Sequence, residues 1–192
     1  MNKKFVIEHL EKSMWPWCKV EYENSAKLIS PYKLIVTNVK KGNYSFGKNS
    51  KIERRKFSEF DIDWKRVCVL DPKAKKVLKT EDKEKFDYFV FGGILGDEKF
   101  NGRTGDELTM KLPSEVSLRH IGNKQFSTDN ALFVTRMILD GKNLKDIKFE
   151  NDVEVKINEI ESVMLPYCYP LVNGKPQISD KLITYLKRKK SF

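Results

Sequence analysis

The sequence predicts an α/β fold: a mostly parallel sheet with flanking helices and a small antiparallel appendage near the C-terminus. Short, almost continuously apolar runs recur along the chain, as in strands that are covered on both faces. Helical patterns lie between these runs, and strands that alternate with helices form parallel sheets. The chain has 192 residues, 40% of them hydrophobic and 12 of them Phe, which is enough to fill one packed core.

Five apolar runs are expected to form strands, because most are rich in β-branched or aromatic residues and several are bounded by turn residues. The third run stops at Asp71-Pro72 and the fourth at Gly92-Gly93. The predicted strands cover residues 5–7, 33–39, 66–70, 86–91 and 116–119.

Helix signals occur between and after these runs. Residues 17–29 place apolar side chains on one face and follow Pro16, which suits a first helical turn. Residues 127–139 begin with Ser-Thr-Asp and stop at Gly141, so this helix has both a start and a stop signal. A last helix is expected over residues 179–186.

The chain is expected to form two parts that pack on each other. Residues 1–150 would form the α/β domain. Apolar and polar residues alternate over 153–157, which predicts a small antiparallel sheet. We therefore expect residues 151–192 to form a C-terminal extension that packs on the domain and faces the substrate.

The charge balance favours an acidic partner. Lys and Arg number 37 against 27 Asp and Glu, which gives a net charge of +10. Nucleic acid or a ribonucleoprotein particle is the natural partner of such a chain. A surface that is generally rich in lysine would explain the same charge equally well.

The cysteines and the hydropathy indicate the compartment. Cys18, Cys68 and Cys168 are odd in number and widely spaced, which argues against a disulfide framework and a structural zinc site, and no metal is expected. Free thiols suit a reducing compartment, so we expect a cytoplasmic protein. No apolar run reaches 18 residues and none near the start suits a signal peptide, so no membrane association is expected.

The most informative stretch is a glycine-rich loop after the fourth strand. Gly92, Gly93 and Gly96 lie within five residues, and Asp97 follows. Ligands of α/β sheets bind at the carboxyl ends of strands, where glycine allows close approach. The loop could therefore offer backbone groups to a nucleoside, or it could be an ordinary turn. The chain lacks the glycine motifs of dinucleotide-binding and P-loop proteins, so those two classes are disfavoured.

Two other stretches could carry chemistry. Residues 118–129 read as a strand end, a loop with glycine and a helix N-terminus, which could receive an anionic group or could simply be capped. Glu8, His9 and Glu11 follow the first strand. They could orient a cationic substrate or accept a proton, or they could be solvated surface residues.

Together these stretches resemble one branch of the SPOUT methyltransferases, a superfamily with a deep C-terminal trefoil knot. The branch includes a yeast enzyme that methylates an arginine of a small-subunit ribosomal protein, and archaeal proteins classed as RNA methyltransferases. The resemblance covers about residues 7–176, with Phe126 and Asn130 departing from the usual Met and Thr. The matching motifs are Val6-Ile7-Glu8-His9-Leu10-Glu11, Trp17 with Glu21-Tyr22, Leu70-Asp71-Pro72, the unbroken FDYFVFGGILGD of residues 86–97, Arg103-Thr104, and residues 122–131.

The resemblance implies a knotted fold and the cofactor S-adenosyl-L-methionine, bound by the 1–150 domain. It leaves open whether the protein is a monomer or a homodimer. The implied cofactor contacts are Leu70, Asp71, Phe91, Gly92, Gly93, Ile94, Leu95, Gly96, Asp97, Arg119, Ile121, Gly122, Lys124, Gln125, Phe126, Ser127, Thr128 and Ala131.

The favoured function is transfer of a methyl group to an arginine of a small-subunit ribosomal protein. A guanidinium has a high pKa, so carboxylates must orient it and take its proton. We expect Glu8 and Asp97 to do this, and Glu11 and Asp71 are the next candidates for the same role. His9, Glu11 and Arg103 are expected to contact the substrate.

The alternative is an RNA methyltransferase acting on ribosomal or transfer RNA, in which Arg103, Arg119 and Lys124 would contact phosphates. A third reading is a non-catalytic module that binds ribosomes. The intact glycines of residues 92–96 argue against that reading.

Overall fold

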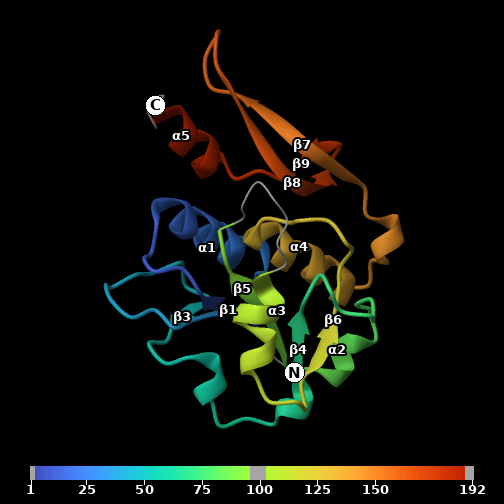
Figure 1. The fold of residues 1–192 in the computed structure, drawn as a ribbon. Helices are drawn as coiled ribbons and strands as arrows, with labels where there is room; N and C mark the ends of the chain where they lie inside the picture. The colour runs from blue at the N-terminus through green and yellow to red at the C-terminus, as the bar shows by residue number, and fades with distance from the viewer. Residues whose placement is uncertain (1–2, 96–102, 189–192) are drawn as a thin grey trace.

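A computed structural model describes residues 3–95 and 103–188 of the chain (Figure 1). Its centre is a six-stranded, entirely parallel sheet of order β3-β2-β1-β5-β4-β6. The strands are β1 (Lys4–His9), β2 (Lys33–Thr37), β3 (Ser50–Ile52), β4 (Val67–Leu70), β5 (Tyr88–Gly93) and β6 (Ser117–Arg119). The five predicted strands are thereby confirmed, and the short edge strand β3 was not expected.

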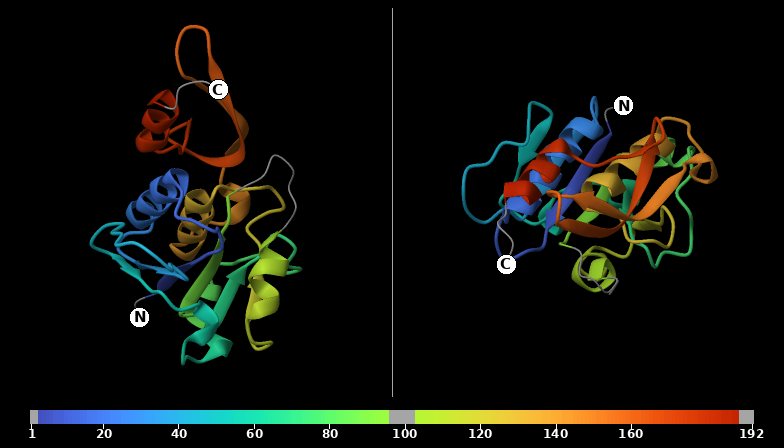
Figure 2. Two further views of the ribbon diagram at one scale, coloured as in Figure 1. Left: turned by 60° about the vertical axis from the view of Figure 1, so that its left-hand side comes forward. Right: turned by 90° about the horizontal axis from the view of Figure 1, so that it is seen from above.

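Helices cover both faces of this sheet. They are α1 (Pro16–Leu28), α2 (Asp82–Lys85), α3 (Arg103–Glu107) and α4 (Thr128–Leu139), with 3-10 turns η1 (Phe57–Glu59), η2 (Trp64–Arg66), η3 (Thr109–Lys111) and η4 (Leu144–Asp146). The long helices α1 and α4 lie side by side on one face, and α3 lies on the other (Figure 2). Pro16 occupies the first turn of α1, and Gly141 follows α4 with φ +108°, as the sequence predicts.

The strands of the sheet centre are buried on both faces, which explains their continuous apolar runs. Phe5 and Ile7 of β1 face α1 and α4, within the larger core cluster. Val6 faces the opposite way and packs with Phe57 of η1 and with Leu108. Because side chains alternate along a strand, Glu8 points to the same face as Val6, and His9 points to the same face as Ile7.

The C-terminal part forms a separate antiparallel sheet and a helix. It consists of β7 (Phe149–Lys156), β8 (Ser162–Val172), β9 (Lys175–Pro176) and α5 (Asp180–Arg188). This part lies above the edge at which the parallel strands end (Figure 1). Its core packs Leu165 and Leu182 against Trp17 and Val20 of α1.

The antiparallel appendage is therefore confirmed, and the boundary expected between residues 150 and 151 falls inside β7. The trefoil knot depends on the path of residues 96–102, which lie outside the described residues, and it stays a prediction. The three cysteines are buried and free. Among the described residues, no helix has the length and apolar character to cross a membrane.

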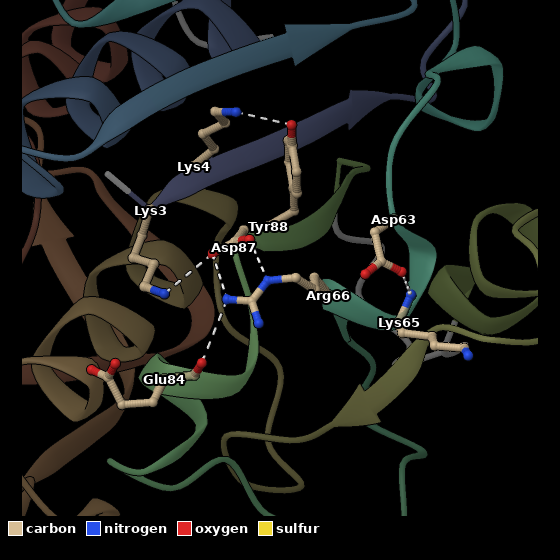
Figure 3. A network of polar contacts seen from close by, with 8 residues as sticks. All are labelled: Lys3, Lys4, Asp63, Lys65, Arg66, Glu84, Asp87 and Tyr88. Carbon is tan, nitrogen blue, oxygen red and sulfur yellow. Dashed lines mark hydrogen bonds and ion pairs between the residues drawn. The ribbon is translucent and has the colours of Figure 1, made fainter. Parts of the chain in front are cut away.

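An ion-pair network joins the starting ends of three strands (Figure 3). Asp87, just before β5, accepts hydrogen bonds from Lys3 at 3.4 Å and from the Arg66 guanidinium through Nη2 at 2.9 Å, with a second bond from Nε. The Lys3 side chain is only 3% exposed, so Asp87 is the partner that offsets the cost of burying its ammonium group. The Arg66 guanidinium, followed by Lys3, lowers the pKa of Asp87 to about 2.

We predict that Asp87→Asn lowers the free energy of unfolding by about 2 kcal/mol at pH 7, because it leaves the buried Lys3 ammonium unpaired. Glu84→Gln is the matched control, because Glu84 accepts from Arg66 through its backbone carbonyl, which the substitution keeps. This control should change stability by less than about 0.5 kcal/mol. Urea unfolding measures both, and equal losses in the two variants would contradict the assignment.

Candidate active site

The parallel register brings the predicted site residues to one edge of the sheet. Glu8 and His9 at the end of β1 lie opposite Gly92 and Gly93 at the end of β5. Leu70 at the end of β4 lies opposite Arg119 at the end of β6. The carboxyl ends of adjacent parallel strands are where α/β proteins bind ligands. The candidate site is therefore the edge formed by β1, β5, β4 and β6.

Glu8 is a buried carboxylate held by two donors. Its Oε2 accepts a hydrogen bond from the backbone N–H of Phe57 at 3.0 Å and another from the Thr37 hydroxyl. The side chain is 4% exposed, and burial raises the pKa of Glu8, although these hydrogen bonds and the charges of Lys56 and Lys40 oppose the shift. Both bonds end on Oε2, so Oε1 is the oxygen left for a substrate N–H.

His9 points to the opposite face of the sheet. Its Nδ1 lies 2.9 Å from the hydroxyl of Tyr22 on α1, and both side chains are buried. Burial lowers the pKa of His9, although the charge of Glu11 opposes the shift, and this favours a neutral ring. The structure thus separates Glu8 from His9, which the sequence places side by side.

Glu11 connects the loops that follow β1 and β5. Its Oε1 accepts a hydrogen bond from the backbone N–H of Leu95 at 3.0 Å. The N–H of Leu10 also donates to the carbonyl of Gly93 at 3.2 Å. In this structure Glu11 therefore positions the glycine-rich loop.

Gly93 is required by the packing of α1. A Cβ at this position would lie 2.3 Å from the Tyr22 hydroxyl oxygen and 2.7 Å from Ile7 Cγ2. A Cβ at Gly92 would meet Ile94 Cδ1 at 3.1 Å and Leu10 Cδ1 at 3.6 Å, both of which are ends of flexible side chains. Gly93 therefore lets Tyr22 reach His9, and its contact with a cofactor stays a prediction.

We predict that Gly93→Ala lowers the free energy of unfolding by about 2 kcal/mol without any ligand, because the added methyl group overpacks the contact with Tyr22. Gly92→Ala is the matched control and should cost less than about 1 kcal/mol, since the neighbouring side chains can turn away. Denaturant unfolding of the two variants provides the test. A smaller loss for Gly93→Ala than for Gly92→Ala would refute this packing role.

Asp71 and Arg119 are held by structural contacts. Asp71 Oδ1 accepts from the Lys73 N–H at 2.9 Å, and its Oδ2 accepts from the Thr109 hydroxyl at 2.8 Å. The Arg119 guanidinium forms a two-point ion pair with Asp82 of α2, at 2.9 and 3.2 Å. Both side chains have these structural partners, the backbones of both lie at the site edge, and their contacts with a ligand stay predictions.

The loop over residues 121–127 is fastened to the antiparallel sheet. The carbonyl of Gln125 accepts from the Cys168 N–H at 2.7 Å, and Lys124 Nζ donates to Asn151 Oδ1 at 3.0 Å. The rings of Phe126 and Phe149 meet edge to face at 5.5 Å. Phe126, which stands where Met is expected, thus packs against β7. Gly122 has φ +115°, which only glycine adopts readily.

Ser127 begins α4, but its hydroxyl does not cap the helix. It donates instead to Asp129 Oδ1 at 2.7 Å, and Asn24 of α1 donates to Asp129 Oδ2 at 2.7 Å. The nearby Glu21 accepts from Trp17 Nε1 at 2.7 Å, which accounts for the Trp17 and Glu21 motif. Burial, followed by the charge of Asp129, raises the pKa of Glu21 to about 8.

We predict that stability falls as pH rises. Glu21 has a pKa of about 8 in the folded protein and an ordinary value of 4.5, so it destabilises the folded state increasingly as the pH rises between these values. The free energy of unfolding should drop by on the order of 3 kcal/mol between pH 5 and pH 8.5. Glu21→Gln should lose most of this slope, and Glu23→Gln should keep it. Urea titrations across this pH range test the prediction, and a wild-type slope in Glu21→Gln would disprove it.

The other predicted residues divide into three groups. Leu70, Phe91 and Ile121 are buried in the main core. Leu95 and Ala131 are partly buried against it, Ile94 is half-buried, and Thr128 donates hydrogen bonds to Glu21. Gly96, Asp97 and the side chain of Arg103 lie outside the described residues, so their roles stay predictions.

Sequence reasoning missed the partners that hold the predicted groups. Thr37 and Phe57 fix Glu8, and Tyr22 fixes His9. Tyr22 belongs to a motif that the sequence displays, but the motif does not indicate its contact. Thr37, a hydroxyl at the end of an apolar strand, carries the one signal that could have suggested a role.

The fold and the site first define a class. A Trm10 protein from Thermococcus kodakaraensis, described as dual specific, has the same fold with a TM-score of 0.51 at 22% identity, over 75% of this chain and 96% of that one. This similarity confirms the SPOUT-type fold. Within it, the family described as "Protein arginine N-methyltransferase SFM1-like" matches residues 4–191.

Similarity to one curated relative extends over nearly the whole chain. The protein arginine N-methyltransferase SFM1 of Saccharomyces cerevisiae is 33% identical over 202 residues, covering 96% of this chain and 94% of the yeast protein. The structure of the yeast enzyme complexed with SAM has a TM-score of 0.86 at 31% identity, over 98% of this chain and 91% of that one. The chain belongs to the SFM1-like family.

Proposed function

We propose that this protein is an S-adenosylmethionine-dependent methyltransferase that modifies an arginine side chain of a protein. One observation carries the proposal. A buried carboxylate, Glu8, has a raised pKa and lies opposite Gly92, where the glycine-rich loop of the family begins. The yeast enzyme was solved in complex with SAM, with SAH and with MTA, which supports the same cofactor here.

The residues at the site edge fit a nucleoside with a sulfonium side chain. Leu70 and Ile121 belong to the main core, and Leu95 and Phe126 pack on its margin, so the strand ends provide an apolar floor. Asn130 Oδ1 is buried and accepts no hydrogen bond from the described residues, so a ligand donor could satisfy it. When bound, S-adenosylmethionine supplies an electrophilic methyl group.

Glu8 is placed to handle the acceptor. Thr37 and Phe57 fix Oε2, and Oε1 can receive an N–H of the incoming guanidinium. A guanidinium is a poor nucleophile while it keeps all its protons. A carboxylate whose pKa is raised by burial is a better base than an exposed one, so Glu8 would orient the side chain and accept its proton.

The hairpin beside the site favours a basic protein substrate. Residues 150–162 carry five Asp or Glu against one Lys, a net charge of −4 in a chain of net charge +10. A hollow of about 370 Å³ lies where this hairpin meets the 121–127 loop, lined by Lys124, Gln125, Asn151, Asp152, Pro166, Tyr167 and Cys168. The hollow is lined by one cation, Lys124, and one anion, Asp152, so the negative charge is that of the exposed acids of the hairpin. Those acids attract a guanidinium and repel a phosphate backbone.

The RNA methyltransferase alternative has weaker support. Arg119, one of its proposed phosphate contacts, is paired with Asp82. Lys124, another, donates to Asn151 on the acidic hairpin. We further propose that the substrate is a small-subunit ribosomal protein in the cytoplasm, since such proteins are basic and would complement the hairpin.

We predict that Glu8→Gln lowers the turnover number about 100-fold or more, because it removes the base and the counter-charge. The assay uses labelled S-adenosylmethionine and proteins extracted with salt from ribosomes. Cofactor affinity, measured by calorimetry, should not change. Glu59→Gln, an exposed change in the η1 turn that carries Phe57, is the matched control and should keep full turnover. Full turnover in Glu8→Gln would overturn the role of Glu8.

A further inference from the structure

One edge of the parallel sheet carries a strongly basic segment. Residues 40–56 carry seven Lys or Arg against one Glu, a net charge of +6. This segment contains β3, the edge strand beside β2, and continues into η1. The candidate active site does not use these charges, apart from the effect of Lys40 and Lys56 on Glu8.

A surface groove of about 540 Å³ lies beside this edge. Strands β1, β2, β3 and β5 form one side of it, and residues 53–62 form the other. Its charged lining residues are Lys4, Lys33, Lys48, Lys51 and Arg55, against Glu53 and Asp61. We name this feature the basic groove.

We propose that the basic groove binds the phosphate backbone of RNA. Lys33, Lys48 and Lys51 are exposed and come from β2, from the loop before β3 and from β3 itself. Lys51 pairs with Glu53 at 2.6 Å but is 70% exposed, so a phosphate can compete for it. Cations from several elements that line one groove suit a polyanion, whose successive phosphates can meet them in turn. A patch that only keeps the protein soluble would not require a groove.

Aromatic rings hold two of the cations in place. The Arg55 guanidinium lies 4.2 Å from the centre of the Phe60 ring. Lys4 Nζ lies 4.5 Å from the centre of the Tyr88 ring and donates to the Tyr88 hydroxyl at 2.9 Å (Figure 3). Cations that are ordered before binding lose less entropy when a phosphate arrives. The rings also give the groove an apolar surface on which a nucleobase can stack.

Negative and positive charge lie on different parts of the surface, which suits a target that contains both protein and RNA. The acidic hairpin lies above the site edge, and the basic groove lies at the β3 side of the sheet. A substrate protein embedded in ribonucleoprotein would present basic protein and RNA together. RNA binding by the groove is nevertheless independent of the proposed methyl transfer.

The competing explanation is protection of the β3 edge. Lysines on an edge strand prevent pairing with another chain, and they would do so without binding any ligand. This explanation predicts no affinity for RNA beyond that caused by net charge. A change at the groove and an equal change elsewhere would then have the same effect.

The test compares two triple variants in a fluorescence anisotropy titration with a labelled 20-nucleotide single-stranded RNA. The groove variant is Lys33→Gln, Lys48→Gln and Lys51→Gln. The control, Lys142→Gln, Lys145→Gln and Lys148→Gln, removes three exposed lysines near η4 and β7. A third variant replaces the three groove lysines by arginine, and melting temperatures verify that each variant is folded.

We expect the groove variant to bind at least about tenfold more weakly than wild type at 100 mM salt. Loss of three contacts should reduce the slope of log K against log salt by about 2. The control and the arginine variant should stay close to wild type. Absence of RNA binding at 50 mM salt, or equal losses in both glutamine variants, would overturn the proposal. So would equally tight binding to phosphatidylserine vesicles or to polyglutamate.

Methyl transfer to free salt-extracted protein separates this proposal from the proposed function. The groove variant should methylate free protein at the wild-type rate. If no variant methylates protein while RNA binding follows the groove, only the proposed function fails.

Discussion

The position of β1 between β2 and β5 is the constraint on which the rest of the candidate site depends. Because β1 is buried on both faces, alternation along the strand sends Glu8 toward Phe57 and His9 toward Tyr22. Pairing with β5 places Gly93 beside His9, and only glycine leaves room there for Tyr22. A shift of one residue in this register would exchange the two faces and leave a carboxylate in the α1 interface.

The C-terminal part is attached to a loop at the edge of the candidate site. It is fastened to the 121–127 loop by the Cys168–Gln125 hydrogen bond and by the contact of Phe126 with Phe149. Through this attachment an acidic hairpin lies at the rim of a basic protein. The buried pair of Glu21 and Asp129 lies below it, at the junction of α1 and α4. The negative charge of the β7–β8 hairpin and the positive charge at the β3 edge thus lie on different parts of the molecule.

Much of the fold could be predicted from the sequence, because buried strands and capped helices have local signatures. The strand β3 could not, since its three residues are half-buried or exposed and are held by pairing with β2. The sequence could indicate which residues lie at the site, but not what each side chain does there. Arg119 looks like a ligand contact, yet its partner Asp82 lies 37 residues away, and no local pattern reveals that ion pair. The same holds for Glu21 and Asp129, which meet only through the packing of α1 on α4.

The most direct experiment determines whether the labelled methyl group is transferred to protein or to RNA. Ribosomes from cells that lack this gene would be incubated with the protein and methyl-labelled S-adenosylmethionine, and the product divided between ribonuclease and protease. We expect label that survives ribonuclease, is released by protease and is recovered as methylarginine after hydrolysis. Label that is lost with the RNA would contradict this expectation and would establish the RNA methyltransferase instead.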